Sequence, residues 1–364
     1  MEGVHGLPAR AILPAALLAA ALALPAQGRA EEGAVQACLR IDDDAARLAC
    51  FDRLHGRSVP PPRPALASSP PDAVAEPSGS LDGPGQPTLQ VREAARAAAG
   101  PLTQAWLLDG SGTPFRLVPY RPIYILPLSA TDNINRRPDS PAPGHSTGVD
   151  LPNRSVEAKF QISAKTLAWE APFGDLWIAY TQSSRWQLYQ GDISRPFRET
   201  NYEPEIILNR AADFGLLGWR GRMVGLSLSH QSNGRALPLS RSWNRVIGHI
   251  GLERDAWSLV IRPWFRIRES ADQDDNPDIE DHMGRADLTL RREGSAGQLL
   301  ALRLRHSLRG GDRSRGSAEL DWAFPLTGRL HGFVQLFSGY GESMIDYNIR
   351  QTRLGVGLSL AGWH

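Results

Sequence analysis

Residues 299–324, LLALRLRHSLRGGDRSRGSAELDWAF, show most clearly the pattern that decides the fold. Leu300, Leu302 and Leu304 fall on one face of an extended chain and arginines fall on the other, and the second half of the stretch alternates apolar and acidic residues. Successive side chains of a β-strand point to opposite faces of a sheet, so this period of two predicts strands with one apolar and one charged face. The fold class that we predict is therefore all-β.

About twelve segments with this alternation follow one another from Phe115 to Leu360. A β-sandwich would show the same alternation with its apolar face turned inward, so alternation alone leaves both architectures open. The segments run close to the ~9–11 residues of a tilted spanning strand, and their polar faces carry both signs of charge, as a packed ionic lumen would. These features favour a twelve-stranded antiparallel transmembrane β-barrel over residues 115–364. Tryptophans that we expect in its interfacial girdles are Trp177, Trp186, Trp243, Trp257, Trp264, Trp322 and Trp363.

The charge balance limits the classes of partner. The chain has 364 residues, with 40 Lys and Arg against 39 Asp and Glu, a formal net charge of +1. A basic face that holds nucleic acid needs an excess of positive charge, so we expect no nucleic-acid partner. The 35 glycines and 28 prolines are typical of a turn-rich chain. After residue 30 no segment reaches the ~18 consecutive apolar residues of a membrane helix.

The first 114 residues differ from the rest of the chain. A positive charge, an apolar run and then small residues predict a signal peptide over residues 1–30. Since an exported chain meets an oxidising compartment, we expect a disulfide between Cys38 and Cys50 in a small helical cap over residues 31–57; a zinc site would lack further ligands nearby. The Pro-, Gly- and Ala-rich composition of residues 58–114 predicts a linker.

Two motifs suggest functions that their surroundings oppose. Residues 144–148, GHSTG, match the nucleophile elbow G-x-S-x-G. Flanking prolines exclude the strand and the helix between which that turn must lie. The acidic residues 272–278, DQDDNPD, lack the glycine and the closing glutamate of an EF-hand. We expect a solvated loop there, with weak cation binding as the alternative.

The stretch 224–245, VGLSLSHQSNGRALPLSRSWNR, carries polar residues on the face that should meet lipid. Even-numbered positions of its first strand are apolar up to Leu228 and then become His230 and Ser232. A hairpin that pairs residue 230 with residue 244 would add Asn244 to the same outer face. Polar groups on a lipid-facing wall are costly, which indicates that these three serve a function.

The three side chains form a chemically coherent set. His230 can take the proton of the Ser232 hydroxyl, and the amide oxygen of Asn244 can hold the other ring nitrogen. The competing interpretation is a polar cluster that caps the strand ends at the level of the lipid headgroups. Spacing alone leaves both interpretations open.

Five longer motifs resemble the outer-membrane phospholipase A family, the calcium-dependent lipases of Gram-negative outer membranes. They follow in order from about Phe115 to the C-terminus: PFRETNYEP (196–204), HQSNGR (230–235), SRSWNR (240–245), DDNPD (274–278) and SGYGES (338–343). The resemblance implies a twelve-stranded outer-membrane barrel that hydrolyses the acyl esters of glycerophospholipids, as a phospholipase A1/A2 and lysophospholipase. It also implies a Ser-His-Asn triad on the outside of the barrel, at the outer-leaflet boundary.

The resemblance implies a role for each residue of the site. Ser232 would attack the acyl ester, and His230 would act first as base and then as acid. Asn244 would orient His230. The backbone N–H of Gly234 would donate to the oxyanion.

Calcium (Ca2+) and a second subunit complete the site that the family implies. The ligands would be the carbonyl oxygen of Arg235, the side chain of Ser240 and the carbonyl oxygen of Ser194 of the partner subunit. Gln182 would lie in the interface of an active homodimer. Its place on an outward apolar stripe agrees with that role, because two glutamines that meet across a two-fold axis satisfy each other.

Two questions are left open: whether a second calcium site exists, and whether the barrel is an enzyme at all. Leu237 stands where the family has an acidic residue, so a second calcium site shared with Asp275 is an open question. The alternative function is a non-enzymatic structural or pore-forming barrel with a vestigial triad. The intact triad and the predicted charged lumen argue against that alternative.

Overall fold

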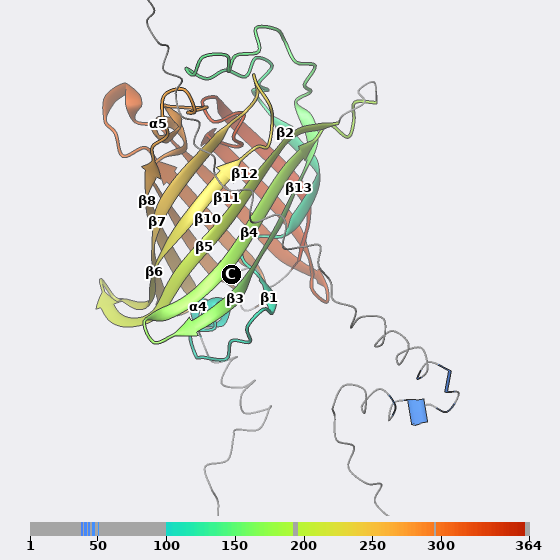
Figure 1. The fold of residues 1–364 in the computed structure, drawn as a ribbon, viewed down its shortest axis with the longest axis vertical. Coiled ribbons are helices and arrows are strands. Elements are labelled where there is room, and N and C mark those ends of the chain that lie inside the picture. The colour runs from blue at the N-terminus through green and yellow to red at the C-terminus, as the bar shows by residue number, and fades with distance from the viewer. Residues whose placement is uncertain are drawn as a thin grey trace, which may run out of the picture. The chain divides into compact units, whose positions relative to one another are not determined.

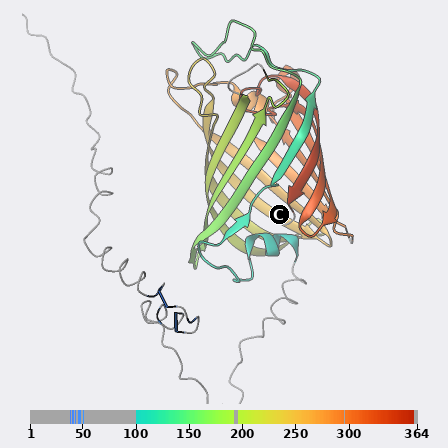
Figure 2. The same ribbon diagram turned by 90° about the vertical axis from the view of Figure 1, so that its right-hand side faces the viewer.

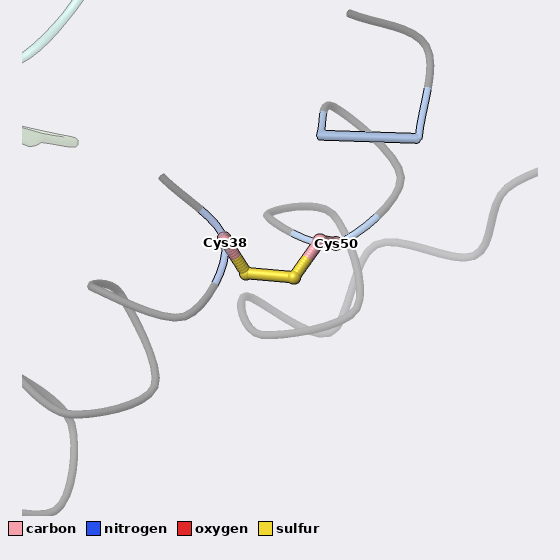
Figure 3. Close-up of a disulfide and its surroundings, with 2 residues drawn as sticks. All are labelled: Cys38 and Cys50. Atoms are coloured by element: carbon pink, nitrogen blue, oxygen red, sulfur yellow. A yellow bond between two sulfur atoms is a disulfide. The ribbon is translucent and has the colours of Figure 1, made fainter. Parts of the chain in front are cut away.

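The computed structural model describes residues 38, 40, 41, 43, 46, 47, 50, 100–191, 196–294 and 296–360. The chain divides into two compact units, residues 1–83 and residues 84–364. In the first unit a disulfide joins Cys38 to Cys50 (Figure 3), which is the pairing that the sequence favours. The predicted signal peptide and most of the predicted cap and linker lie outside the described residues.

Twelve strands of the second unit form a closed antiparallel sheet (Figures 1 and 2). In chain order they are β2 (Tyr124–Thr131), β3 (Val156–Ala171), β4 (Gly174–Trp186), β5 (Phe197–Leu216), β6 (Trp219–Ser232), β7 (Ser242–Arg254), β8 (Trp257–Ile267), β9 (Ala286–Glu293), β10 (Leu299–His306), β11 (Gly316–Thr327), β12 (Leu330–Tyr340) and β13 (Arg350–Leu360). Each pairs with its neighbours in sequence, and β13 pairs with β2, which closes the barrel. A short strand, β1 (Leu117–Pro119), also pairs with β3. The predicted twelve-stranded barrel is confirmed.

The two ends of the barrel differ. Short turns, such as residues 172–173, join the strands at one end. The two longest loops of the other end are residues 132–155 and residues 268–285, the second of which carries α5 (Ile279–Met283); the shorter loop 307–315 carries η2 (Gly311–Arg313). In outer-membrane barrels the long loops are extracellular and the short turns periplasmic. β6 ends and β7 begins at the long-loop end, so the predicted triad lies on the extracellular side.

Alternate residues of the strands face outward and form an apolar wall. On β6, Leu226 and Leu228 are 58% and 55% exposed, whereas Met223 and Ser227 on the other face are buried. Phe265 on β8 is 78% exposed. An apolar surface repeated around a whole barrel is the surface that a bilayer covers. Separately, no helix among the described residues is long and apolar enough to cross a membrane.

Charged side chains fill the lumen and pair across it. Glu203 on β5 accepts hydrogen bonds from Arg121 at 2.6 Å and from Arg245 at 2.8 Å. Lys159 on β3 donates to Gln335 on β12 at 2.8 Å. Buried charges persist in proteins when they are paired and hydrogen-bonded. This interior agrees with the packed ionic lumen that the alternating charges predict.

A short helix, α4 (Pro101–Trp106), packs into the end of the barrel that carries the short turns (Figures 1 and 2). Its Leu102 and Trp106 are buried, and Thr103 accepts a hydrogen bond from Nη2 of Arg222 at 2.7 Å. These residues belong to the segment 58–114 for which the composition predicts a linker. Six residues are too few to show a helical period, and so short a helix depends on tertiary burial for its stability.

The expectation of an interfacial position is wrong for three tryptophans. Trp177, Trp243 and Trp264 are buried inside the barrel rather than at its outer rim. Trp243 alternates in phase with Arg245 on β7, and the guanidinium of Arg245 lies 4.2 Å from the centroid of its ring. An indole has an apolar ring and a polar N–H group, so it is compatible with either side of the barrel wall. Its odd or even position along the strand decides which side it faces. Trp363 lies outside the described residues.

Candidate active site

β6 and β7 form the hairpin that carries the predicted triad. Their register places His230 directly opposite Asn244 and Ser232 opposite Ser242. Nδ1 of His230 donates a hydrogen bond to Oδ1 of Asn244 at 2.8 Å. The structure therefore brings the histidine and the asparagine of the predicted triad into direct contact.

Ser232 lies two residues after His230 on the same strand, so the two side chains share the outer face. His230 is exposed and Ser232 is half-buried. In the described part of the chain, no residue forms a hydrogen bond with the Ser232 hydroxyl. That hydroxyl is free to give its proton to Nε2 of His230, the ring nitrogen that Asn244 leaves open.

Gly234 turns the chain directly after the nucleophile strand. Its φ is +61°, in the left-handed region that favours glycine. A Cβ atom at this position would lie 3.0 Å from Cε2 of Tyr202. Conformation and close packing therefore both require glycine at the position where an oxyanion donor is predicted.

Asn233, which the sequence analysis does not single out, holds the following loop together. Its Oδ1 accepts hydrogen bonds from the backbone N–H of Arg235 at 3.3 Å and of Arg241 at 3.0 Å. Its Nδ2 donates to the carbonyl oxygen of Leu239 at 2.8 Å. Loop 233–241 is thus closed around one buried amide. The local signal was the Asn-Gly pair, which is typical of a tight turn.

Asp275 ties this loop to two other parts of the extracellular surface. Its carboxylate accepts hydrogen bonds from Ser240 Oγ at 2.7 Å, Ser242 Oγ at 3.1 Å and His145 Nε2 at 2.9 Å. His145 belongs to the GHSTG motif, which lies in a loop without strand or helix and is therefore no nucleophile elbow. The acidic residues 272–278 do form a loop between strands, exposed at Asp272 and Gln273, but Asn276 is fully buried and Asp275 accepts hydrogen bonds from three side chains.

Loop 233–241 carries oxygen atoms of the kind that calcium prefers. The Ser240 hydroxyl gives its proton to Asp275, so its lone pairs remain available to a cation. The carbonyl oxygen of Arg235 belongs to the same loop, and calcium takes hydroxyl, carbonyl and carboxylate oxygens. The donor set therefore fits the ion. Ser194 lies outside the described residues. No group of three or more His, Cys, Asp or Glu side chains forms a metal site within the described ranges.

Gln182 lies in the same row across the sheet as the nucleophile. The strand register places Ile162 opposite Gln182, Gln182 opposite Tyr202, and Tyr202 opposite Ser232. Opposite side chains on adjacent strands are ~5 Å apart, so only Tyr202 separates Gln182 from Ser232. Oε1 of Gln182 accepts a hydrogen bond from the hydroxyl of Tyr180 at 3.0 Å.

An open groove on the outer wall includes Gln182 and Tyr202 of this row. Phe160, Phe197 and Tyr202 supply aromatic walls, and Gln182 and Gly234 also line it. The rings of Phe160 and Phe197 pack edge to face with their centroids 6.1 Å apart. The groove therefore connects the predicted interface residue with the predicted oxyanion donor.

Fold and site together define a class of protein. A closed barrel with an apolar outer wall and an ionic lumen is the arrangement of a transmembrane β-barrel. On that wall, at the extracellular end, a serine, a histidine and an asparagine lie together. This is a membrane barrel with a candidate hydrolase site on its lipid-facing side.

Comparison with known proteins identifies the family. Residues 104–360 match the Phospholipase A1 family. A protein of Neisseria meningitidis serogroup B is 35% identical over 357 residues, which covers 92% of both chains. Phospholipase A1 of Escherichia coli K12 is 37% identical over 258 residues, 70% of this chain and 84% of that protein.

Solved structures agree. The outer membrane phospholipase A of Escherichia coli superposes with a TM-score of 0.59 at 36% identity, over 68% of this chain and 98% of that one. The outer membrane phospholipase of Salmonella typhi, a dimer with bound calcium, gives a TM-score of 0.60 at 36% identity, over 69% and 94%. The chain belongs to the phospholipase A1 family and is an outer-membrane phospholipase. The predictions of family, fold, enzymatic class and location are confirmed, whereas the roles of single residues stay predictions.

Proposed function

We propose that the chain hydrolyses the acyl ester bonds of glycerophospholipids with Ser232 as nucleophile, His230 as general base and Asn244 as the residue that orients His230. The observation that carries this proposal is the 2.8 Å hydrogen bond from His230 Nδ1 to Asn244 Oδ1 on the lipid-facing wall. Polar side chains are kept at such positions at a cost, and the reaction explains why these are kept.

In the proposed reaction, Nε2 of His230 takes the proton of Ser232 while the serine oxygen attacks the ester carbonyl. Oδ1 of Asn244 accepts a hydrogen bond from the Nδ1–H group of His230 throughout, so the proton stays on Nδ1 and Nε2 is unprotonated before the attack. The backbone N–H of Gly234 donates to the oxygen on which negative charge develops. His230 then protonates the leaving alcohol. A water molecule, activated by the same nitrogen, hydrolyses the acyl-enzyme.

The groove on the outer wall is the proposed place for the acyl chain of the substrate. Phe160, Phe197 and Tyr202 offer it an apolar lining, and Tyr202 lies opposite Ser232 in the strand register. A lipid that approaches along the wall can enter this groove while its hydrocarbon stays within the bilayer. The ester would then lie between Ser232 and Gly234.

We also propose a calcium ion at loop 233–241. The relative from Salmonella typhi is a dimer with bound calcium. Here the carbonyl oxygen of Arg235 and the hydroxyl of Ser240 would hold the ion, together with the carbonyl oxygen of Ser194 of the partner subunit. When bound, the ion supplies positive charge near the developing oxyanion. Asp275 orients the Ser240 hydroxyl for this role through the 2.7 Å hydrogen bond.

The proposed active form is a homodimer whose interface includes Gln182. The amide of Gln182 lies on the outer wall and bonds to Tyr180 of the same strand. Two such amides that meet across a two-fold axis would satisfy each other away from water. Because only Tyr202 separates Gln182 from Ser232 in the row, dimer contact would reach the catalytic site directly.

The experiment that tests the proposal is the release of fatty acid from mixed phospholipid–detergent micelles, with calcium or with EDTA. We expect activity only with calcium and a loss of about 10⁴-fold in Ser232→Ala. Ser146→Ala, in the GHSTG loop, is the matched control and should keep wild-type activity. Full activity of Ser232→Ala would overturn the triad. Equal activity in EDTA would overturn the calcium proposal and leave the triad intact.

A further inference from the structure

Glu269 lies in the loop after β8, two residues beyond the end of that strand, and reaches the site from there. Its Oε1 accepts a hydrogen bond from Nδ2 of Asn244 at 2.9 Å. On its other side Asn244 accepts from Nδ1 of His230 at 2.8 Å. The register prepares this contact, since Asn244 lies opposite Ile267, just before Glu269. A continuous chain of hydrogen bonds therefore crosses β6, β7 and the end of β8.

The chemistry of Glu269 sets the direction of this chain. An asparagine amide has one accepting and one donating end and can turn over. A carboxylate only accepts, so Glu269 requires the Nδ2 end of Asn244 on its side and leaves Oδ1 for His230. Because Oδ1 only accepts, Nδ1 of His230 must carry the proton. Nε2 then stays free to act as the base.

The charge of Glu269 is not taken up by a close ion pair. Nη2 of Arg266 lies 3.9 Å from Oε2 of Glu269 but 2.5 Å from Oδ1 of Asp274. Burial, together with Asp274 and Asp275, raises the pKa of Glu269, while Arg266 and His230 oppose that rise. The attraction between Glu269 and His230 also works in the other direction. It favours the protonated imidazole that forms when His230 takes the serine proton.

We propose that Glu269 is a positioning residue of the triad, which fixes the orientation of Asn244 and the tautomer of His230 and stabilises the imidazolium by its charge. The proposal rests on the proposed Ser-His-Asn function and adds a fourth side chain to it. It also explains how an asparagine can serve on a lipid-facing wall. The neutral amide stands on the wall, and the negative charge stands behind it at the edge of the extracellular loop.

The first test compares the kinetics of full-length variants in mixed micelles at saturating calcium. Glu269→Ala should lower kcat about tenfold with little change in KM, and Glu269→Gln about threefold, because a glutamine can still accept but carries no charge. The acid limb of the pH–rate profile should move to lower pH by about half a unit in both, since a less stabilised imidazolium loses its proton more readily. Asp272→Ala, an exposed acidic residue of the same loop, is the matched control and should change neither quantity.

The second test exchanges the amide and the acid. Asn244→Asp alone sets two carboxylates against each other and should lower kcat more than tenfold. In Asn244→Asp/Glu269→Gln one donor and one acceptor face each other again, so kcat should recover to within about threefold of the wild type. A merely structural role for Glu269 predicts no such rescue.

The outcomes separate this inference from the function on which it rests. Full activity of Ser232→Ala would remove the triad, and the positioning role with it. A different result would overturn the positioning role alone. In that result Ser232→Ala and Asn244→Ala are impaired, whereas Glu269→Ala keeps the wild-type kcat and the wild-type pH profile. A Glu269→Ala loss that persists undiminished in the Asn244→Ala background would also overturn it. If Glu269→Ala fails to fold, Glu269→Gln and the exchanged pair decide.

Discussion

β6 and β7 carry two serine–histidine pairs, one on each side of the barrel wall. Outside, Ser232 and His230 form the proposed active site at the extracellular end. Inside, Oγ of Ser227 and Nε2 of His249 are 2.9 Å apart, and Ser227 lies 3.2 Å from a carboxylate oxygen of Glu205. By residue type the inner set, a serine, a histidine and a glutamate, resembles a hydrolytic triad at least as closely as the outer one does.

The two pairs differ in their surroundings. Ser227 and His249 are buried, and the serine hydroxyl is committed to its partners in the lumen. Outside, His230 is exposed, and the Ser232 hydroxyl has no hydrogen-bond partner among the described residues. A lipid reaches the wall of a barrel and not its packed interior. Access from the bilayer, which depends on the face of the strand that a side chain occupies, therefore decides which pair can serve a phospholipase.

The largest difference in activity should appear between the alanine variants of the two histidines. His230→Ala removes the proposed base and should lower fatty-acid release about 10⁴-fold. His249→Ala leaves Ser227 without one partner and should keep the activity of the folded protein within about threefold, with a stability cost of ~1–3 kcal/mol. Fatty-acid release, normalised to the folded fraction seen by heat-dependent gel mobility, measures both. Similar losses of activity in the two variants would contradict the assignment of catalysis to the outer pair.

Changes to the lumen should act on stability and not on catalysis. Glu157 is fully buried and accepts from Arg198 and Arg353, each at 2.8 Å. Glu157→Gln removes the negative charge that two buried guanidinium groups share and should destabilise the barrel by ~3 kcal/mol. Denaturant unfolding in detergent measures this, and kcat of the folded enzyme should be unchanged. Asp213 forms an exposed ion pair with Arg220. Asp213→Asn is therefore the control and should change neither the free energy of unfolding nor kcat.

A methyl group at the proposed oxyanion donor should disturb only the outer site. Gly234→Ala forces a Cβ to within 3.0 Å of the Tyr202 ring and strains a φ of +61°. Displacing one oxyanion donor costs about 10²-fold, so kcat should fall by that order. Gly144 also has a positive φ, +78°, but a Cβ atom added there would meet no atom within 4 Å, so Gly144→Ala should leave kcat unchanged. If both variants lose activity alike, backbone strain and not the oxyanion donor is responsible.

The smallest expected effect concerns the proposed dimer contact. Gln182→Ala removes one amide from the outer wall and should weaken the calcium-dependent dimer and its activity about tenfold. Sedimentation in detergent with and without calcium measures the dimer alongside fatty-acid release. Ser338→Ala alters another outward hydroxyl, which contacts Thr352 on β13, and should have no effect. Activity loss in Gln182→Ala without a change in association would contradict the interface role.

Several features could be predicted because they are local. Alternation on β10 and β11 assigns one face to lipid and one to the lumen, and the same rule places His230 and Asn244 outside. The pairing of residue 230 with residue 244 follows once the two strands form a hairpin. Each family motif is a run of consecutive residues, so the motifs too are visible without a structure.

Other features depend on contacts between distant parts of the chain. Glu269 meets Asn244 only when β8 pairs with β7 in its observed register, and His145 meets Asp275 only when two extracellular loops fold over the same mouth. No local period signals such contacts, which explains why the sequence analysis missed them. The helix α4 is a similar case, since its burial depends on the lumen that receives it.

The strands, the two faces of the wall and the side on which the serine, the histidine and the asparagine lie all follow from the order of residues alone, because a period of two is a property of neighbouring residues. The tertiary structure alone decided how loop 233–241 closes around Asn233 and which carboxylate stands behind Asn244. It also decided that Ser227 and His249 are sealed within the lumen. These depend on barrel closure and strand register, which bring residues far apart in the chain within hydrogen-bond distance.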